Sequence, residues 1–362
     1  MEINEVTGRK VLELIADSMY TRHSEGAFCR LSNGHIAYVY SRFTGSSHDD
    51  APSHIALSVS ADEGETWSEP EKILDPADFN THNIMSVSLI ELQDGGIGLF
   101  FGSRQTPSVG YKHLLRSYDD LKTFQDETIC SLADRPGYYV LNNDRVVRLH
   151  SGRLVMPVAF HRGGYSKHNP GSVYFENRGV LSFRLSDDDG NTWRESTDVV
   201  YPPFTRTRSG LQEPGVIECM NGVLWAFART DQMHQYECFS FDGGEHWTAA
   251  QPSRFTGCNA PLQIKRAPQD QSLIAVWNPI PNYNGRTIYP GFAGRTPIVY
   301  ARSYDDGLTW SEPFVLDGRP DSGYCYPAIF FTNDHSMLVS YCSGSMKEGD
   351  CLSNTTVRKV AL

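Results

Sequence analysis

The sequence lacks the residue spacings from which proteins build metal and redox sites. None of its eight cysteines is separated from another by two residues, and its twelve histidines form no His-x-x-x-His or His-Glu-x-x-His pattern. Several cysteines lie inside apolar, strand-like runs, which favours buried free thiols over disulfides or a zinc site. We therefore expect neither a protein-built metal site nor a cofactor.

Long apolar runs, positive charge and nucleotide-binding motifs are also missing. Residues 1–20 contain no apolar run long enough for a signal peptide or a membrane span, which predicts a cytoplasmic protein unless a leader has been removed. A formal net charge of −11 argues against nucleic acid or an anionic membrane as a partner. The absence of a phosphate-cradling glycine loop and of a Gly-x-Ser-x-Gly elbow gives no support to nucleotide binding or serine hydrolase chemistry.

What the sequence does contain is an eight-residue motif that occurs five times. The copies are SADEGETW, SYDDLKTF, SDDDGNTW, SFDGGEHW and SYDDGLTW, beginning at residues 60, 117, 186, 240 and 303. Ser and Asp side chains accept hydrogen bonds from backbone N–H groups one or two residues on, Gly allows a positive φ, and the closing aromatic ring packs between sheets. The motif therefore predicts a turn between two strands, and we expect no catalytic Asp within it. The second copy departs, with Leu121 for Gly and Phe124 for Trp.

A second set of tight turns precedes these motifs and predicts the architecture. The turns are Asn33-Gly34, Asp94-Gly95, Ser151-Gly152, Asn221-Gly222, Asp270-Gln271 and Asp334-His335. Six turns with five motifs imply six four-stranded units, of which the last needs its fourth strand from residues 10–15. The sequence thus predicts an all-β fold, a six-bladed β-propeller that forms a single domain over residues 1–362, with the N-terminal strand closing the last blade.

The connections at the opposite ends of the predicted strands are long, irregular and polar. They comprise residues 44–53, 104–111, 161–177, 230–235, 278–295 and 343–352. Because variable loops on a rigid scaffold carry most binding residues, we expect a pocket where the inner strands converge. The side chains expected there are Glu25, Asn83, Asn142, Glu213, Asn259, Tyr326, Arg42, Asp49, Asp50, Arg104, His161, Arg229, Asp231, Arg295 and Tyr341. They predict a small carbohydrate, neutral or anionic, as the binding partner, or else a salt-bridged plug across the channel.

Several stretches at these positions resemble the sialidase (neuraminidase) superfamily of Asp-box propellers, over nearly the whole chain. LQEPGVIE is similar to the family's segment with the catalytic glutamate, Glu213 here. CYPAIFF is similar to the segment with the tyrosine nucleophile, Tyr326, with Tyr324 as the rival. The family's acid/base aspartate lies in the first long loop, where SRFTGSSHDD offers Asp50, or else Asp49.

The resemblance extends to part of the family's carboxylate-binding arginine triad. AFART and GRTPIVYARSYDDGLTW are similar to the segments of the second and third arginines, giving Arg229 and Arg295. The first arginine is missing, because the chain has Glu25-Gly26-Ala27 where sialidases have Arg-Ile-Pro. A carboxylate there repels the carboxylate of sialic acid, at a cost of several kcal/mol at an effective dielectric of about 20. Arg42 and Arg104 are candidates to restore part of the triad from another direction.

The resemblance implies a retaining glycosidase with a tyrosine nucleophile. Tyr326 would attack the anomeric carbon with Glu213 as its base, and Asp50 would protonate the leaving oxygen and then activate water. We therefore expect an exo-acting glycoside hydrolase that releases a terminal sugar other than common sialic acid. The alternatives are a lyase or other sugar-modifying enzyme that uses His161 and tyrosines, and a non-catalytic carbohydrate- or protein-binding propeller.

The remaining candidates have less definite roles. Asn142 either contacts substrate or caps the channel as part of NNDR, and His161 is a hydrogen-bonding residue or a second acid/base. Asp231 and Gln235 either bind sugar hydroxyls or brace Arg229.

Overall fold

The computed structural model describes residues 6–106, 108–131, 137–165, 172–203, 206–279 and 294–362. Within these ranges the chain is all-β, as predicted, and its helical structure is one 3₁₀ turn, η1 (Pro76–Phe79). Among the residues described, no helix has the length and apolarity required to cross a membrane.

Four sheets of the described chain have four strands each. The first contains β2 (Arg22–Arg30), β3 (Ile36–Phe43), β4 (Ser53–Ser60) and β5 (Glu71–Leu74). Two more contain β17 (Gln212–Glu218), β18 (Leu224–Arg229), β19 (His234–Ser240) and β20 (Gln251–Thr256), and β21 (Gln263–Arg266), β22 (Leu273–Trp277), β23 (Ile298–Ser303) and β24 (Phe314–Asp317). The last contains β25 (Ser322–Phe331), β26 (Ser336–Ser345), β27 (Asn354–Ala361) and, from the other end of the chain, β1 (Arg9–Leu14).

A nine-stranded sheet lies between the first of these sheets and the one that starts at β17. One part has β6 (Ile84–Glu91), β7 (Ile97–Thr106), β8 (Val109–Ser117) and β9 (Gln125–Ile129). The other has β10 (Tyr138–Val140), β11 (Val147–Arg148), β12 (Leu154–His161), β15 (Val180–Ser186) and β16 (Arg194–Glu195). A parallel bridge between Tyr138 and Gly110 joins the two parts. A separate hairpin consists of β13 (Gly163–Tyr165) and β14 (Val173–Phe175).

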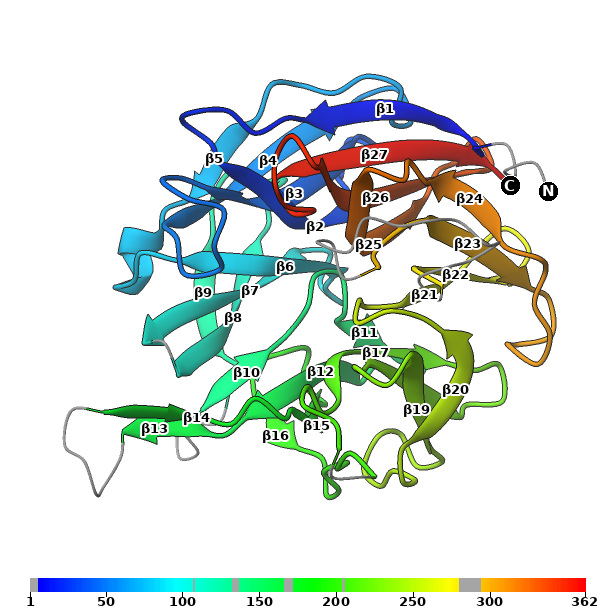
Figure 1. Cartoon of the computed structure of the whole chain (residues 1–362). Helices are drawn as coiled ribbons and strands as arrows, with labels where there is room; N and C mark the ends of the chain where they lie inside the picture. Colours follow the sequence, from blue (N-terminus) through cyan, green and yellow to red (C-terminus); the bar gives the residue numbers. More distant parts are fainter. Residues whose placement is uncertain (1–5, 107, 132–136, 166–171, 204–205, 280–293) are drawn as a thin grey trace.

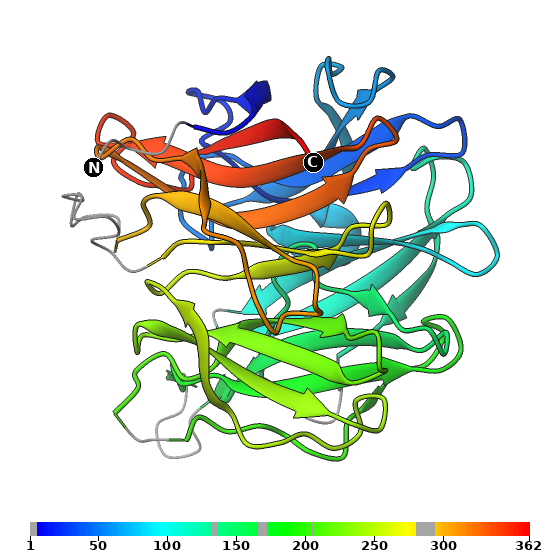
Figure 2. The same cartoon turned by 90° about the vertical axis from the view of Figure 1, so that its right-hand side faces the viewer.

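The sheets follow one another around the centre of the molecule in chain order (Figures 1 and 2). Each packs on its neighbours, so the middle strands are buried on both faces, and every residue of β3 and β22 is buried. Each sheet is open, and no closed sheet occurs among the described residues. The all-β class is therefore confirmed, and the count of six blades stays a prediction.

The strand at the N-terminus occupies its predicted place. β1 pairs antiparallel with β27, with Arg9 opposite Lys359 and Leu14 opposite Thr355. This pairing gives the last sheet its fourth strand and joins the two ends of the chain (Figure 1). All six predicted tight turns also lie where expected, each between two consecutive antiparallel strands.

The repeated motif forms the predicted turns, with one correction to the hydrogen bonding. Each copy lies between the third and fourth strands of a unit, such as the copy at 60–67 between β4 and β5. In that copy Ser60 Oγ accepts a hydrogen bond from the N–H of Gly64, and Asp62 from that of Thr66. The main N–H donors are thus four residues on, not one or two, so each motif closes a wider loop than the sequence suggested. Leu121, which replaces Gly in the second copy, still has φ +67°.

The cysteines match the sequence prediction of buried free thiols. All eight cysteines are free, and all except the half-buried Cys29 are buried. Residues 166–171 and 280–293, which belong to two of the predicted loops, lie outside the described residues.

Candidate active site

Bulges in four inner strands position side chains at one end of the molecule. The antiparallel register is interrupted between Ser24 and Ala27 in β2, Met85 and Ser88 in β6, Gln212 and Gly215 in β17, and Cys325 and Ala328 in β25. At each interruption one non-glycine residue has a left-handed backbone: Glu25 (φ 58°), Ser86 (φ 63°), Glu213 (φ 47°) and Tyr326 (φ 55°). Such residues cost roughly 1–3 kcal/mol each and cluster at functional sites, where a bulge re-aims a side chain.

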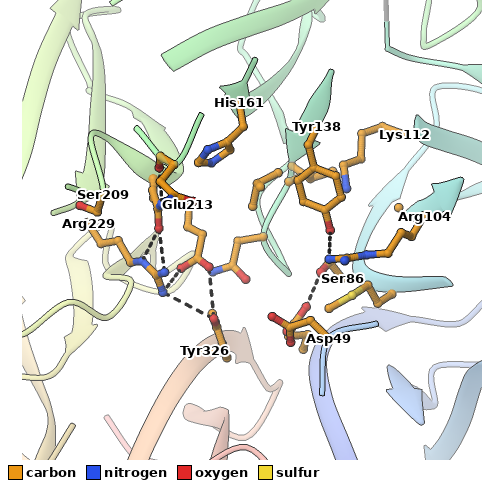
Figure 3. A pocket seen from close by; sticks show the side chains of 18 of the residues that line it. Asp49, Ser86, Arg104, Lys112, Tyr138, His161, Ser209, Glu213, Arg229 and Tyr326 are labelled. Atoms are coloured by element: carbon orange, nitrogen blue, oxygen red, sulfur yellow. Dashed lines mark hydrogen bonds and ion pairs between the residues drawn. The ribbon is translucent and has the colours of Figure 1, made fainter. Parts of the chain in front are cut away.

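All four of these side chains line one cavity of about 610 Å³. Residues expected from the sequence that also line it are Asp49, Asn83, Arg104, Asn142, His161, Arg229, Asp231 and Asn259. Figure 3 shows Glu213, Arg229 and Tyr326 grouped on one side, with Tyr138, Lys112 and Arg104 on the other. The cavity is open to solvent and polar, so the predicted salt-bridged plug does not fill it.

Glu213, Arg229 and Tyr326 contact one another directly. The Tyr326 hydroxyl donates a hydrogen bond of 3.2 Å to Glu213 Oε1, and Arg229 Nη1 lies 2.8 Å from Glu213 Oε2. The same Nη1 is 3.5 Å from the Tyr326 oxygen, while Nη2 donates to Gln212 Oε1 at 2.8 Å. A phenol, a carboxylate and a guanidinium are thus held within hydrogen-bonding distance, all facing the cavity (Figure 3).

The electrostatics of this cluster keep the phenol protonated until a base acts on it. Burial raises the pKa of Tyr326 well above its ordinary value, and the Glu213 carboxylate raises it further, against the opposing charges of Arg229 and Arg295. Burial alone would lower the pKa of Arg229, but the nearby Glu213 and Tyr326 raise it. An adjacent carboxylate is therefore the natural acceptor of the Tyr326 proton.

Arg295 lies behind Tyr326 instead of on the cavity wall. Its guanidinium carbon is 5.6 Å from the centroid of the Tyr326 ring, and Nη2 donates to the Asn259 carbonyl at 3.2 Å. Its Nη1 is 3.3 Å from Cys325 Sγ. In this arrangement Arg295 supports the phenol ring, and a substrate must displace these contacts to reach it.

Glu25, at the position of the missing arginine, is held by another arginine. Its carboxylate accepts from Arg22 Nη2 at 2.7 Å and also from the Ser86 hydroxyl. Arg22 Nη1 binds Asp49 Oδ1 at 2.6 Å, and Arg22 itself is fully buried. Burial raises the pKa of Glu25, against the opposing charge of Arg22. Glu25 is thus paired with an arginine.

Asp49 and Asp50 differ in what they face. Asp49 lines the cavity, and its side chain remains 61% exposed despite the ion pair with Arg22. Burial alone would raise the pKa of Asp49, but Arg22 outweighs this effect and lowers it. Asp50 is exposed and lies outside the cavity lining, and its carbonyl accepts from His82.

Tyr324, the rival of Tyr326, is fully buried and lies outside the cavity lining. Its hydroxyl donates to Asp317 Oδ1 at 2.9 Å, and Tyr341 lies beside it with its ring centroid 5.8 Å away. Tyr341 was also expected in the pocket, but its hydroxyl donates a hydrogen bond of 3.3 Å to Oδ2 of the same Asp317.

Two more predicted residues lie outside the cavity lining. Arg42 packs its guanidinium over the Tyr20 ring at 3.8 Å and donates from Nε to His54 Nε2 at 2.9 Å. Gln235 is buried, with its amide donating to the Ala260 carbonyl at 2.8 Å. Neither residue completes the arginine triad or braces Arg229.

The remaining predicted residues in the cavity also have structural partners. Asn83 donates to the carbonyls of Asp49 and Ala51, which fixes the first long loop. Asp231 accepts from Thr207 and from the N–H of Arg208. Asn142 Oδ1 accepts from the N–H of Asn143, while its buried Nδ2 has no partner among the described residues.

Several cavity residues were not predicted from the sequence. They are Ser86, Lys112, Tyr138, Arg208, Ser209 and Gln212, with Arg22 directly behind the wall. A lysine in the apolar strand GYKHLLRS is a recognisable signal, because an isolated charge in a buried strand needs a partner or a purpose. Among the described residues, no group of three or more His, Cys, Asp or Glu side chains could hold a metal ion.

The family model described as a BNR repeat-like domain matches residues 40–339. The chain belongs to this family. Among curated proteins, nothing matches the chain.

Solved structures of similar fold include sialidases. A Hadza microbial sialidase shares 18% identity at a TM-score of 0.73, over 98% of this chain and 68% of that one. The intramolecular trans-sialidase of Ruminococcus gnavus shares 14% identity at a TM-score of 0.68, covering 96% and 97%. A Dyadobacter fermentans protein of unknown function shares 19% at 0.71, covering 97% and 99%. As predicted, the chain of this BNR repeat-like protein is related to the sialidase superfamily.

Proposed function

We propose that this protein is an exo-acting glycoside hydrolase that releases a terminal sugar, neutral or acidic, from a glycan or oligosaccharide. The scaffold we propose is a single six-bladed propeller of sialidase type, whose strand ends form the cavity. The observation that carries the proposal is the hydrogen bond from Tyr326 to Glu213 in an open, polar cavity. The sialidase-like fold supports it, since sialidase chemistry uses such a pair.

In the proposed reaction Tyr326 is the nucleophile. Its oxygen attacks the anomeric carbon as Glu213 Oε1, 3.2 Å away, takes the phenolic proton. Arg229, 3.5 Å from the same oxygen, stabilises the phenolate that develops and restrains the base. Arg295 holds the ring from behind by its position over the face, which limits the rotation of the phenol.

The acid/base role goes to Asp49 in this proposal, not to Asp50. Asp49 is the one of the two that lines the cavity, and its side chain is exposed to it. Because Arg22 lowers its pKa, Asp49 is mostly ionised at neutral pH. Protonation of the leaving oxygen is then favoured as the pH falls toward that pKa, and we expect turnover to be highest under acidic conditions.

Ordinary sialic acid remains a poor fit to this cavity. Glu25 occupies the position of the first triad arginine, and Arg295 is engaged behind Tyr326. Of the three arginines that grip a sialic acid carboxylate in the family, Arg229 alone lines the cavity, and Glu213 neutralises it. The terminal sugar is therefore one whose recognition does not depend on that triad.

The test is a substrate screen on the intact protein and two matched tyrosine variants. Wild type is assayed on p-nitrophenyl glycosides and oligosaccharides, and the best substrate is used for Tyr326→Phe and Tyr324→Phe. We expect Tyr326→Phe to lower turnover roughly 10³-fold or more, since the nucleophile is lost. Tyr324→Phe, which removes a buried hydroxyl from Asp317, should lower the melting temperature and leave turnover unchanged. Equal turnover of Tyr326→Phe and wild type would rule out the assigned nucleophile.

A lyase is the second candidate, and His161 is the observation that favours it. His161 Nδ1 lies 3.0 Å from the Glu176 carbonyl, which must accept, so Nε2 is the unprotonated nitrogen in the neutral ring. Burial lowers the pKa of His161, which keeps the ring neutral. A lyase would yield an unsaturated sugar that absorbs ultraviolet light. This activity would be lost in His161→Gln but not in Tyr326→Phe.

A further inference from the structure

The wall opposite Tyr326 contains a buried amine without a partner. Lys112, on β8, is 6% exposed and lines the cavity (Figure 3). Its Nζ has no hydrogen bond or ion pair within the described residues, although its backbone N–H and carbonyl are both bonded. An unpaired ammonium is expensive to bury, and is seldom kept in a protein without a partner or a ligand.

A glycine on the neighbouring strand provides the space for this ammonium. Gly102 of β7 lies directly opposite Lys112 in the register of the two strands. Any Cβ at position 102 would overlap Lys112 Nζ. Gly102 does not have a positive φ, so the backbone does not require glycine there. The absence of a side chain at position 102 therefore makes room for the side chain of Lys112.

Arg104 adds a second positive charge to the same wall. It follows Gly102 by two residues on β7, and its Nη2 donates to the Tyr138 hydroxyl at 2.8 Å. Its guanidinium carbon lies 4.9 Å from the centroid of the Tyr138 ring, which holds the group in place. The only hydrogen bond of its guanidinium group among the described residues is the one from Nη2, so Nη1 retains donors for a ligand.

The two acids on this side of the cavity share a single arginine. Glu25 and Asp49 both bind Arg22, at 2.7 and 2.6 Å, which balances one of their two negative charges. No ion pair of Lys112 or Arg104 with an acid occurs in the described part of the chain, although Glu25 is near enough to Lys112, and Asp49 to Arg104, for their charges to interact. This wall thus has three positive charges and two negative ones, and an incoming anion meets an excess of positive charge.

We propose that Lys112 and Arg104 form an anion subsite that binds a carboxylate or sulfate substituent of the sugar held in this cavity. The subsite lies across the cavity from Arg229, so it receives a different part of the sugar from the one that faces Tyr326 (Figure 3). The inference rests on the proposed function for the identity of the ligand as a sugar. It narrows the substrate class to acidic or sulfated sugars.

Equilibrium binding of sugar pairs that differ only in charge tests the subsite. Glucuronate, galacturonate and mannuronate are compared by calorimetry with glucose, galactose and mannose, and the 6-sulfates of the same hexoses form a third arm. We expect at least one acidic or sulfated sugar to bind wild type about tenfold tighter than its neutral counterpart or more, as charge-assisted hydrogen bonds require. The arm that shows the preference tells carboxylate from sulfate. No charge preference in any pair would overturn the inference.

Two variants and one control locate the preference. Lys112→Gln, which removes the charge, and Gly102→Ala, which displaces the ammonium, should each reduce the charge preference at least about fivefold. Lys122→Gln, at an exposed lysine in the neighbouring turn, should leave it unchanged. Melting temperatures show that each variant is folded. A charge preference that survives Lys112→Gln in a folded protein would contradict the assignment.

The binding measurement separates this inference from the proposed function, because it requires no turnover. If the protein cleaves no glycoside but still prefers charged sugars through Lys112, the anion subsite is supported and the proposed hydrolase function is ruled out. Cleavage of glycosides by a protein that binds acidic or sulfated sugars no more tightly than their neutral counterparts would do the opposite, because it would keep the hydrolase and rule out the subsite.

Discussion

The two ends of the strands use the left-handed backbone conformation in different ways. In four of the five repeated turns a glycine has this conformation, with φ between 85° and 94° at Gly64, Gly190, Gly244 and Gly307, although the preceding residue is also left-handed, as at Glu63 (φ 56°). At the cavity end it is adopted by Glu25, Ser86, Glu213 and Tyr326, with φ between 47° and 63°. Glycine adopts this conformation without a steric cost, whereas other residues lose about 1–2 kcal/mol each. Left-handed residues at the turn end thus close hydrogen-bonded loops, whereas the four at the cavity end turn particular side chains into the cavity.

The largest expected contrast is between a carboxylate at each end. Glu213→Gln removes the base beside Tyr326, and we expect kcat to fall about 10²–10⁴-fold in a variant that still folds. Asp188→Asn weakens the turn at 186–193, where Asp188 accepts from Thr192, and should lower the melting temperature without changing kcat. Steady-state kinetics and thermal unfolding of both variants check this. A loss of kcat in folded Asp188→Asn would remove the distinction between the two ends.

The turn glycines offer the next largest effect. Gly190→Ala forces a side chain onto φ +88° and against Leu114, so we expect a loss of about 2–3 kcal/mol in the free energy of unfolding. Gly222→Ala has a similar φ of +82° but open space around the new methyl, and should cost about 1 kcal/mol. Urea titrations measure both. Equal losses would mean that packing at the repeated turn adds nothing to the backbone effect.

At the cavity end, substitution of Lys112 should raise the free energy of unfolding instead of lowering it. Burial lowers its pKa to about 8, with Glu25 opposing and Arg104 adding to the shift. The folded state then holds this proton less tightly than the unfolded state, so stability is reduced below pH 8 and recovers as the pH rises toward 10.5. Lys112→Met should therefore raise the free energy of unfolding at pH 7 by roughly 1–2 kcal/mol. Unfolding titrations at pH 7 and 10 check this, and a less stable variant at pH 7 would be inconsistent with it.

The smallest effect is a pH dependence that separates the two ends. Burial, with Arg42 adding, lowers the pKa of His23 and His54 to about 4. Their stabilising contribution is complete above pH 6.5 and is lost as the pH falls toward 4. In the turns, hydrogen bonds from Thr66 lower the pKa of Asp62 to about 2, so that region weakens only below about pH 4.

His54→Gln tests this separation. The amide can still accept from Arg42 Nε but does not titrate. The variant should lose roughly 1 kcal/mol less stability than wild type between pH 6.5 and 4.5. Melting curves across this interval check it, and parallel curves for the two proteins would argue against a neutral His54 in the fold.

The turns and strand order were predictable because their determinants are local. Each motif forms its turn through hydrogen bonds that span four residues, so the eight residues of the motif determine the turn by themselves. Counting turns against motifs was enough to place β1 beside β27. Composition and the spacing of the motifs thus predict the all-β class, the turns and the position of the N-terminal strand.

The choice between neighbouring candidates was not predictable, because bulges alter strand periodicity. Tyr324 and Tyr326 are two residues apart and would share a face of a regular strand. The register shift between Cys325 and Ala328 leaves Tyr324 buried against Asp317 and turns Tyr326 into the cavity. Arg22 and Lys112 were missed for a different reason, since their roles depend on contacts with other strands or other parts of the chain.

The pairing of β1 with β27 has a consequence for biosynthesis. β1 is synthesised long before β27, and because Arg9 is opposite Lys359 it has no partner strand until β27 has emerged. Until then the hydrogen-bonding edge of β1 stays open to other chains. A product cut short before β27 would therefore keep that edge exposed.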